Sequence, residues 1–162
     1  MLIRLVDHSD IPKWLSLSNE YYCYVKELTH DLSEWYDGND TSPTFDDYMQ
    51  AKIEQQEAFM AVDDLDNCLG IIAISKKNNR VTFFGVSHST DFQAVGHELL
   101  RYALCILDNS APVYINEIAN PSPHIQKHGK LYTSIGIEYS CESIENGVPV
   151  NTYIRSAKSV EE

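Results

Sequence analysis

The first quarter of the chain predicts one short strand followed by two helices. Ile3–Val6 alternates between apolar and polar residues, as a half-buried strand does. Polar capping side chains follow, and the apolar spacing then predicts a helix that ends at about Leu28. The expected buried stripe of this helix is Ile11, Trp14, Leu15, Tyr22 and Val25. After a polar loop, a second helix is expected from Thr44 to about Gln56, because Thr44 and Asp47 resemble a capping box.

From Ala58 onward the apolar period becomes that of strands. Three strands separated by Asp-, Asn- and Lys-rich turns predict an antiparallel meander: Phe59–Val62, Cys68–Ser75 and Arg80–Val86. The remaining expected elements are a helix over Asp91–Leu107 that buries Val95, Leu99, Ala103 and Leu107, a strand over Pro112–Ala119, a helix over Pro123–Ser134 that stops at Gly136, and a hairpin of Ile137–Cys141 and Pro149–Ile154 around Glu145–Gly147.

This order of elements predicts an α/β (α+β) fold. We expect one domain over residues 1–162, with a mixed, mostly antiparallel sheet of about seven strands flanked by about four helices.

Charge is distributed unevenly along the chain. The formal net charge is −12; residues 1–66 hold 15 acidic and 4 basic side chains, whereas the remaining 96 residues hold 9 and 8. A protein that binds nucleic acid needs a basic face for phosphate contacts, so this class is not expected. The acidic half is equally compatible with a plain soluble surface and with a field that attracts cationic partners.

We expect no segment of this sequence to target or anchor the chain. Its longest apolar run falls far short of the ~18 residues of a membrane span, so we expect a cytoplasmic protein with no membrane partner. The four cysteines are dispersed and form no CxxC pair, which favours reduced thiols. His124 and His128 lie four positions apart without a third ligand nearby, so a surface pair and no metal site are expected.

The junction between the strand that ends at Val86 and the helix that begins near Asp91 is the first candidate site. The N-terminal amides of a helix have no partner within it, and the helix dipole adds partial positive charge, so anions bind there. Small residues such as Ala94 and Gly96 would let a diphosphate approach the backbone. Every strand–helix junction has such an end, so this signal alone is weak.

The element order and two motifs resemble the GNAT superfamily of acyl-CoA-dependent N-acetyltransferases over nearly the whole chain. Leu131–Glu138 resembles the family signature FYxxxGFE, and Val86–Leu100 resembles its pyrophosphate loop followed by paired leucines. The resemblance implies acetyl-CoA as the acyl donor. The residues that it assigns to the cofactor are Phe84, Gly85, Val86, Asp91, Phe92, Gln93, Ala94, Val95, Gly96 and His97.

Three positions depart from the family pattern. The Arg or Gln of the loop is Asp91, its first Gly is Ala94, and the family's Asn seven residues before the signature Tyr falls at Ile125. A carboxylate at a helix N-terminus accepts the amide hydrogen bonds itself and repels phosphate. A plain helix cap at Asp91 is therefore the alternative to a cofactor site.

Tyr132 and Glu117 are the expected catalytic residues. By resemblance, Tyr132 is the general acid that protonates the departing thiolate, and its alternative is a packing role. Glu117 is the first candidate for the general base and His88 the second. For each of the two, a solvated or hydrogen-bonded side chain is the alternative.

The acceptor side is expected around Tyr22, Trp35 and Tyr36, which stand among carboxylates in the sequence. Aromatic walls with carboxylates suit an amine cation, although aromatic packing under an acidic surface explains them equally. We therefore expect direct transfer to a small cationic amine or a protein amine; family resemblance alone suggests a homodimer. The rival hypothesis is a catalytically inactive GNAT-like binding or regulatory module with a degenerate CoA loop.

Overall fold

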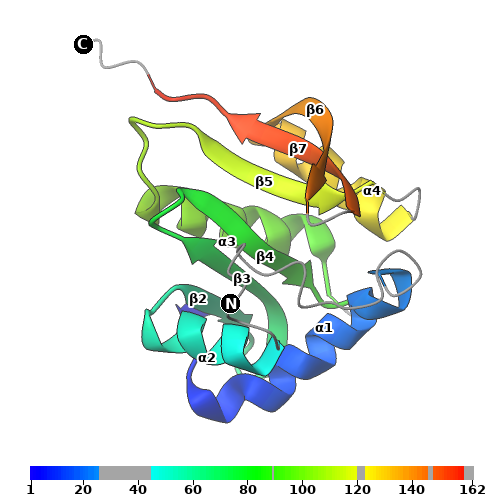
Figure 1. Ribbon diagram of the computed structural model, residues 1–162. Helices are drawn as coiled ribbons and strands as arrows, with labels where there is room; N and C mark the ends of the chain where they lie inside the picture. The colour runs from blue at the N-terminus through cyan, green and yellow to red at the C-terminus, as the bar shows by residue number, and fades with distance from the viewer. Residues whose placement is uncertain (26–44, 89, 120–122, 146–147, 159–162) are drawn as a thin grey trace.

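The computed structural model describes residues 1–25, 45–88, 90–119, 123–145 and 148–158 (Figure 1). In chain order the elements are β1 (Leu2–Leu5), a 3-10 turn η1 (His8–Asp10), α1 (Ile11–Val25), α2 (Phe45–Glu54), β2 (Ala58–Val62), β3 (Cys68–Ser75), β4 (Arg80–Val86), α3 (Phe92–Ile106), β5 (Val113–Ile118), α4 (Pro123–Ser134), β6 (Glu138–Glu145) and β7 (Val148–Arg155). None of the described helices has the length and apolar character that crossing a membrane requires.

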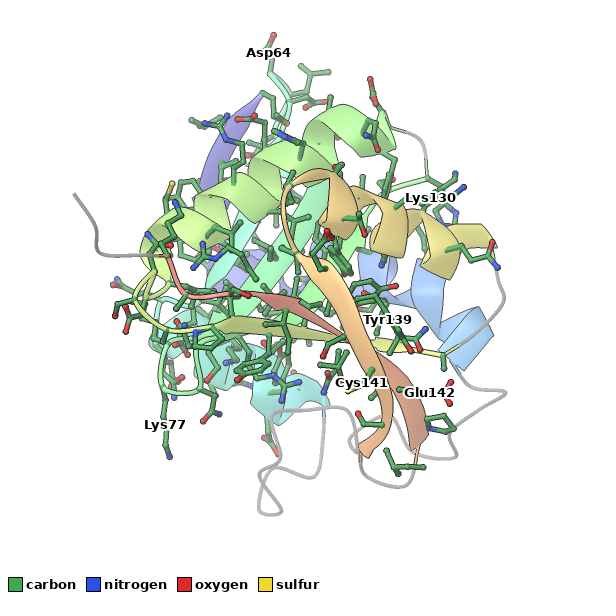
Figure 2. The ribbon with its side chains drawn as sticks, turned by 90° about the horizontal axis from the view of Figure 1, so that it is seen from above. Asp64, Lys77, Lys130, Tyr139, Cys141 and Glu142 are labelled. Atoms are coloured by element: carbon green, nitrogen blue, oxygen red, sulfur yellow. The ribbon has the colours of Figure 1, made fainter. Side chains whose placement is uncertain are left out.

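The seven strands form one sheet in the order β1-β2-β3-β4-β5-β7-β6. Neighbouring strands are antiparallel except β4 and β5, which run parallel and are connected through α3. A parallel pair needs such a crossover because a tight turn cannot return the chain in the same direction. At one edge lies β6, along which Tyr139, Cys141 and Glu142 are exposed (Figure 2).

An apolar core covers each face of the sheet. On β2, Phe59 and Ala61 belong to the core under α3 and α4, whereas Met60 and Val62 belong to the core under α1 and α2. Figure 1 shows the two pairs of helices on opposite faces. Because both faces are covered, β2 and most of β3 are apolar at consecutive positions rather than at alternate ones.

The predicted fold class is confirmed, with every expected strand and helix present in the expected order. The bounds of β3, β4 and α4 coincide with the predicted ones, and the predicted buried face of α3 is buried. The first strand, Leu2–Leu5, begins and ends one residue earlier than predicted. The strand β6 ends at Glu145 instead of Cys141, because its polar end still pairs with β7 as far as the Glu145–Val148 pair. Apolar patterns do not report the length of an exposed edge strand.

The buried stripe of α1 differs from the predicted one. Trp14 is completely buried, but Leu15 is 40% exposed, and Leu17 at 3% takes its place. Positions three and four residues apart share a helix face, so Leu17 follows Trp14 on the buried side while Leu15 points away. The side chains of Tyr22 and Val25 lie outside the described residues.

Candidate active site

The strands β4 and β5 pair only where they begin. Arg80 lies opposite Tyr114 and Val81 opposite Ile115, and no further β4–β5 pair occurs within these two described strands. The other edge of β4 stays paired with β3 as far as Val86. The carboxyl ends of β4 and β5 therefore diverge (Figure 1), and the end of β4 packs against α4 through aromatic contacts of Phe84.

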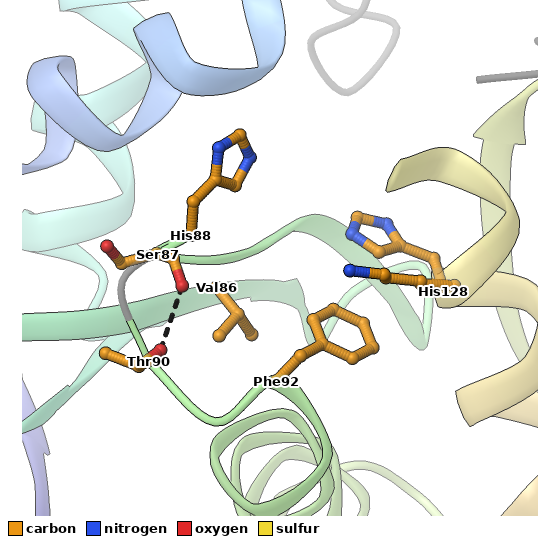
Figure 3. Close-up of a pocket in the computed structure, with 7 residues that line it drawn as sticks. Val86, Ser87, His88, Thr90, Phe92 and His128 are labelled. Atoms are coloured by element: carbon orange, nitrogen blue, oxygen red, sulfur yellow. Dashed lines mark hydrogen bonds between the residues drawn. The ribbon is translucent and has the colours of Figure 1, made fainter. Parts of the chain in front are cut away.

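A small pocket of about 70 Å³ opens beside the end of β4 (Figure 3). It is lined by Val86, Ser87, His88, Thr90 and Phe92 from the junction of β4 with α3, and by Lys127 and His128 from α4. A wider groove of about 360 Å³ is lined by Pro12, Lys13, Ser16, Leu17 and Glu20 from α1, by Cys68 and again by Ser87. The two spaces therefore adjoin the same strand end, one towards α4 and the other towards α1.

Asp91 is the N-cap of α3. Its carboxylate accepts a hydrogen bond from the Ala94 amide at 3.2 Å, and its carbonyl accepts one from the Val95 amide at 3.1 Å. The carboxylate is exposed and stands where an anion would use the helix N-terminus. Asp91 is thus a helix cap, as the alternative interpretation of the sequence expected. An anionic ligand at this helix end would lie beside the negative charge of its carboxylate.

Gly96 is buried and faces α4 rather than the first turn of α3. A Cβ atom on Gly96 would lie 2.6 Å from Leu131 Cδ2 and 3.2 Å from Phe84 Cζ. The missing side chain therefore makes room for the close approach of α4, and the contact of this glycine with a diphosphate stays a prediction.

The other predicted cofactor residues divide into buried and exposed positions. Phe84, Gly85, Val86 and Val95 are buried, and Phe92 and His97 are half-buried. Gln93 and Ala94 are exposed in the first turn of α3, next to the Asp91 cap. The exposed positions, the half-buried His97 and the pocket-lining Val86 and Phe92 are the predicted cofactor residues that are open to a ligand.

Glu117, His128 and Tyr132 form a hydrogen-bonded cluster between β5 and α4. Glu117 follows Val113 and Ile115 at alternate positions of β5, so it points to the face that α4 covers. His128 and Tyr132 are four residues apart on α4 and share one side of it. The Tyr132 hydroxyl donates to Glu117 Oε2, and His128 Nδ1 lies 3.1 Å from Glu117 Oε1.

Aromatic packing holds the rings of this cluster. The His128 ring is stacked on Phe92 with 5.5 Å between centroids and an interplanar angle of 6°. Tyr132 packs edge-on against Tyr153 at 5.1 Å. Burial raises the pKa of the Tyr153 hydroxyl, and the negative charge of Glu117 adds to the effect. His128 is 2% exposed and Tyr132 is fully buried, so neither side chain has room to turn without moving its neighbours.

The two predicted catalytic residues, Tyr132 and Glu117, are therefore in direct contact. His88, the second candidate base, is exposed and lies near α1, where its amide donates to Glu20 Oε1 at 2.9 Å. The predicted acceptor residues, namely the side chain of Tyr22 together with Trp35 and Tyr36, lie outside the described residues.

Sequence reasoning missed His128 and Lys127. The expectation of a surface histidine is wrong for His128, which is buried against Glu117. Its spacing of four residues from Tyr132 was a usable signal, because it places both side chains on the helix face that meets β5. Among the described residues no group of three His, Cys, Asp or Glu side chains could hold a metal ion.

Solved structures with a similar overall fold include several acetyltransferases. Similar chains are an N-acetyltransferase from Staphylococcus aureus (TM-score 0.66, 11% identity, 95% of this chain and 100% of that one), a GNAT-family acetyltransferase from Listeria monocytogenes (0.59, 14%, 96% and 94%) and the aminoglycoside 6′-N-acetyltransferase from Enterococcus faecium (0.56, 15%, 100% and 100%). No family model and no curated protein sequence matches this chain. At such low identity the likeness shows the fold.

Proposed function

We propose, from the premise that this chain has the GNAT acetyltransferase fold, that it is an acetyl-CoA-dependent N-acetyltransferase that transfers directly to a primary amine. One observation carries the proposal. Tyr132 and Glu117 are bonded to each other beside His128, which lines the pocket at the diverging ends of β4 and β5. Proton transfer to the leaving group is what this reaction needs from the protein.

The residues at this pocket fit acetyl-CoA in two respects and oppose it in one. The end of β4 and the half-buried Phe92 offer an apolar wall for an extended arm, and Lys127 offers a positive charge for a diphosphate. Asp91 opposes the diphosphate by charge and by using the Ala94 amide. When bound, the thioester supplies the acetyl group.

Tyr132 is the proposed general acid. Its hydroxyl proton is held by Glu117 before reaction, and the fully buried ring keeps water away from that proton. Proton transfer from a phenol of pKa ~10 to a thiolate whose conjugate acid has a pKa of ~8.5 is uphill by only about 2 kcal/mol, so a positioned phenol can serve as the acid. The fixed orientation of the ring is what makes the transfer efficient.

The acceptor proposed is a small cationic amine or a protein amine. Its entry side is the groove beside α1, where Glu20 supplies a carboxylate next to Ser87. The excess of acidic residues before residue 67 gives the same half of the chain a field that attracts cations. The E. faecium neighbour is named for acetylating an aminoglycoside, which is a small polycationic amine.

Calorimetric titration with acetyl-CoA tests the cofactor, and release of the CoA thiol in the presence of spermidine, kanamycin or a lysine-containing peptide tests transfer. Tyr132→Phe should lower turnover by about 10²-fold or more while changing acetyl-CoA affinity much less. Tyr102→Phe is the matched control, because Tyr102 is exposed on α3 away from the pocket. Unchanged turnover in Tyr132→Phe removes Tyr132 from the mechanism.

The second candidate is a catalytically inactive module of the same fold. It is favoured by the Asp91 carboxylate at the N-terminus of α3, where a diphosphate would be bound. Absence of acetyl-CoA binding at millimolar concentration selects this alternative over the enzyme.

A further inference from the structure

The pocket beside α4 and the groove beside α1 meet at the turn that follows β4. Ser87 lines both spaces, and His88, the next residue, lines the pocket. Glu20 on α1 lines the groove. The side chains of His88 and Glu20 are 40% and 31% exposed, so each is reachable from its own space. A contact between these two residues therefore joins the two spaces.

Hydrogen bonds from three directions fix how the chain leaves β4. The Ser87 amide donates to the Leu69 carbonyl at 2.9 Å and so continues the ladder between β4 and β3. The Ser87 carbonyl accepts from the Thr90 amide at 3.2 Å and from the Thr90 hydroxyl at 2.9 Å (Figure 3). The His88 amide donates to Glu20 Oε1 at 2.9 Å, across 68 positions of the sequence. This last bond ties the turn to α1.

Glu20 is also the acidic residue of the described groove lining. The α1 residues that line the groove are spaced three or four apart, so one side of the helix faces it. Lys13, nearer the start of the helix, is bonded to the Asp66 carbonyl at 2.8 Å and to its carboxylate at 3.2 Å. The positive charge of Lys13 is thus offset within the protein, and a cationic ligand in the groove meets the carboxylate of Glu20.

We propose that Glu20 has two roles in the reaction: it is a positioning residue for the turn between β4 and α3, and it is a specificity residue for the acceptor ammonium. The inference rests on the proposed N-acetyltransferase function. Oε1 holds the His88 amide and thereby the wall of the pocket, while the charge of the carboxylate attracts the amine in the groove. A carboxylate has two oxygens and about four acceptor positions, so an amide and an ammonium can bind it together.

Two substitutions separate these roles. Glu20→Gln keeps an oxygen acceptor at the same reach for the His88 amide and removes the charge. Glu20→Ala removes both, and because alanine is a good helix former, α1 itself is preserved. Glu54→Gln and Glu54→Ala are the matched controls. Glu54 is an exposed acid at the end of α2 that lines neither space, so its variants have the same change in net charge.

Calorimetric titration with acetyl-CoA tests the positioning role. Glu20→Ala should bind acetyl-CoA about 5- to 10-fold more weakly than Glu20→Gln, because only the alanine variant lacks the bond that holds the turn. The two Glu54 variants should bind it equally. Equal affinities in Glu20→Ala and Glu20→Gln overturn the proposal, since the missing hydrogen bond would then have no effect on the pocket.

Steady-state kinetics test the specificity role with whichever of spermidine, kanamycin and the lysine-containing peptide the wild type acetylates. At saturating acetyl-CoA, Glu20→Gln should raise the KM of the amine about fivefold or more and change kcat much less. The difference from the wild type should narrow as salt is added, because the groove is open to solvent. An amine KM in Glu20→Gln equal to that of the wild type overturns the proposal.

Nuclear magnetic resonance of isotope-labelled protein without ligands tests the bond itself. The amide resonance of His88 should shift in Glu20→Ala, shift less in Glu20→Gln and stay in place in Glu54→Ala. A His88 amide that is unchanged in Glu20→Ala overturns the proposal, because the positioning role requires this contact in solution.

The failures of the two proposals differ. Absence of acetyl-CoA binding and of thiol release in the wild type refutes the enzyme and, with it, both roles of Glu20. A wild type that binds acetyl-CoA and acetylates an amine, together with equal acetyl-CoA affinities in the two Glu20 variants, overturns the inference while the acetyltransferase stands.

Discussion

Asp91 is the residue at which stability and cofactor binding oppose each other. Its carboxylate caps α3 through the Ala94 amide at 3.2 Å, and the same helix end is the proposed position of the diphosphate. Asp91→Asn keeps a side-chain acceptor of similar shape and removes the charge. Asp91→Ala removes both. The pair of variants therefore separates the charge from the cap.

The expected magnitudes follow from these two roles. Replacing a capping Asp by Ala costs about 1 kcal/mol, which for a chain of this size lowers the melting temperature by about 2–4 °C. Asn is as good a cap as Asp, so Asp91→Asn should melt close to the wild type. Two unit charges about 4 Å apart in water repel by about 1 kcal/mol, so removal of the exposed charge should tighten acetyl-CoA binding about fivefold.

Calorimetric titration of acetyl-CoA at low and high salt, combined with thermal melts, measures both effects. The gain in affinity in Asp91→Asn should shrink as salt is added, because exposed charges are screened beyond about 8–10 Å at physiological ionic strength and more strongly above it. Weaker binding in Asp91→Asn would refute the reasoning and place the diphosphate away from this helix end. An affinity that is unchanged in both variants would do the same.

Three further predictions concern the scaffold of the site. Asp10 is buried and bonded to Arg4 at 2.7 and 2.9 Å, and this hydrogen bond is the main cause of the lowered pKa of its carboxyl group. Its contribution to stability is therefore present above the unfolded pKa of ~3.9 and is lost as the pH falls through the lower folded pKa. Asp10→Asn should accordingly cost about 2–4 kcal/mol of unfolding free energy in denaturant melts at neutral pH, and progressively less in acid. Gly136 has a φ of +88°, and among the described residues no atom lies within 4 Å of the place that a Cβ would take, so Gly136→Ala should cost about 1–2 kcal/mol through backbone strain alone, and an unchanged melting temperature would contradict this. Gly96→Ala should lower the unfolding free energy by about 1–3 kcal/mol, because the new Cβ would overlap Leu131. If the same substitution is just as destabilising in a Leu131→Ala background, the overlap is not the cause.

The helix stop at Gly136 shows how far local pattern reaches. A glycine after the apolar positions of α4 predicted the end of the helix, and the structure has the expected cap: the Ile137 amide donates to the Tyr132 carbonyl at 2.9 Å and the Gly136 amide to the Thr133 carbonyl at 3.2 Å. This cap ends the helix shortly after Tyr132. The location of the candidate acid on the last turns of α4 was therefore readable from the sequence.

The sequence by itself determined the elements, their order and most of their apolar faces, with part of the α1 stripe as the exception, because spacing along a strand or helix is a local property of the chain. It also placed Tyr132 and Glu117 on adjacent elements. Only the tertiary structure decided that His128 joins them, that Gly96 serves α4, and that the ends of β4 and β5 diverge. Each of these depends on how far apart two elements pack and at what register, and no periodicity within either element carries that distance.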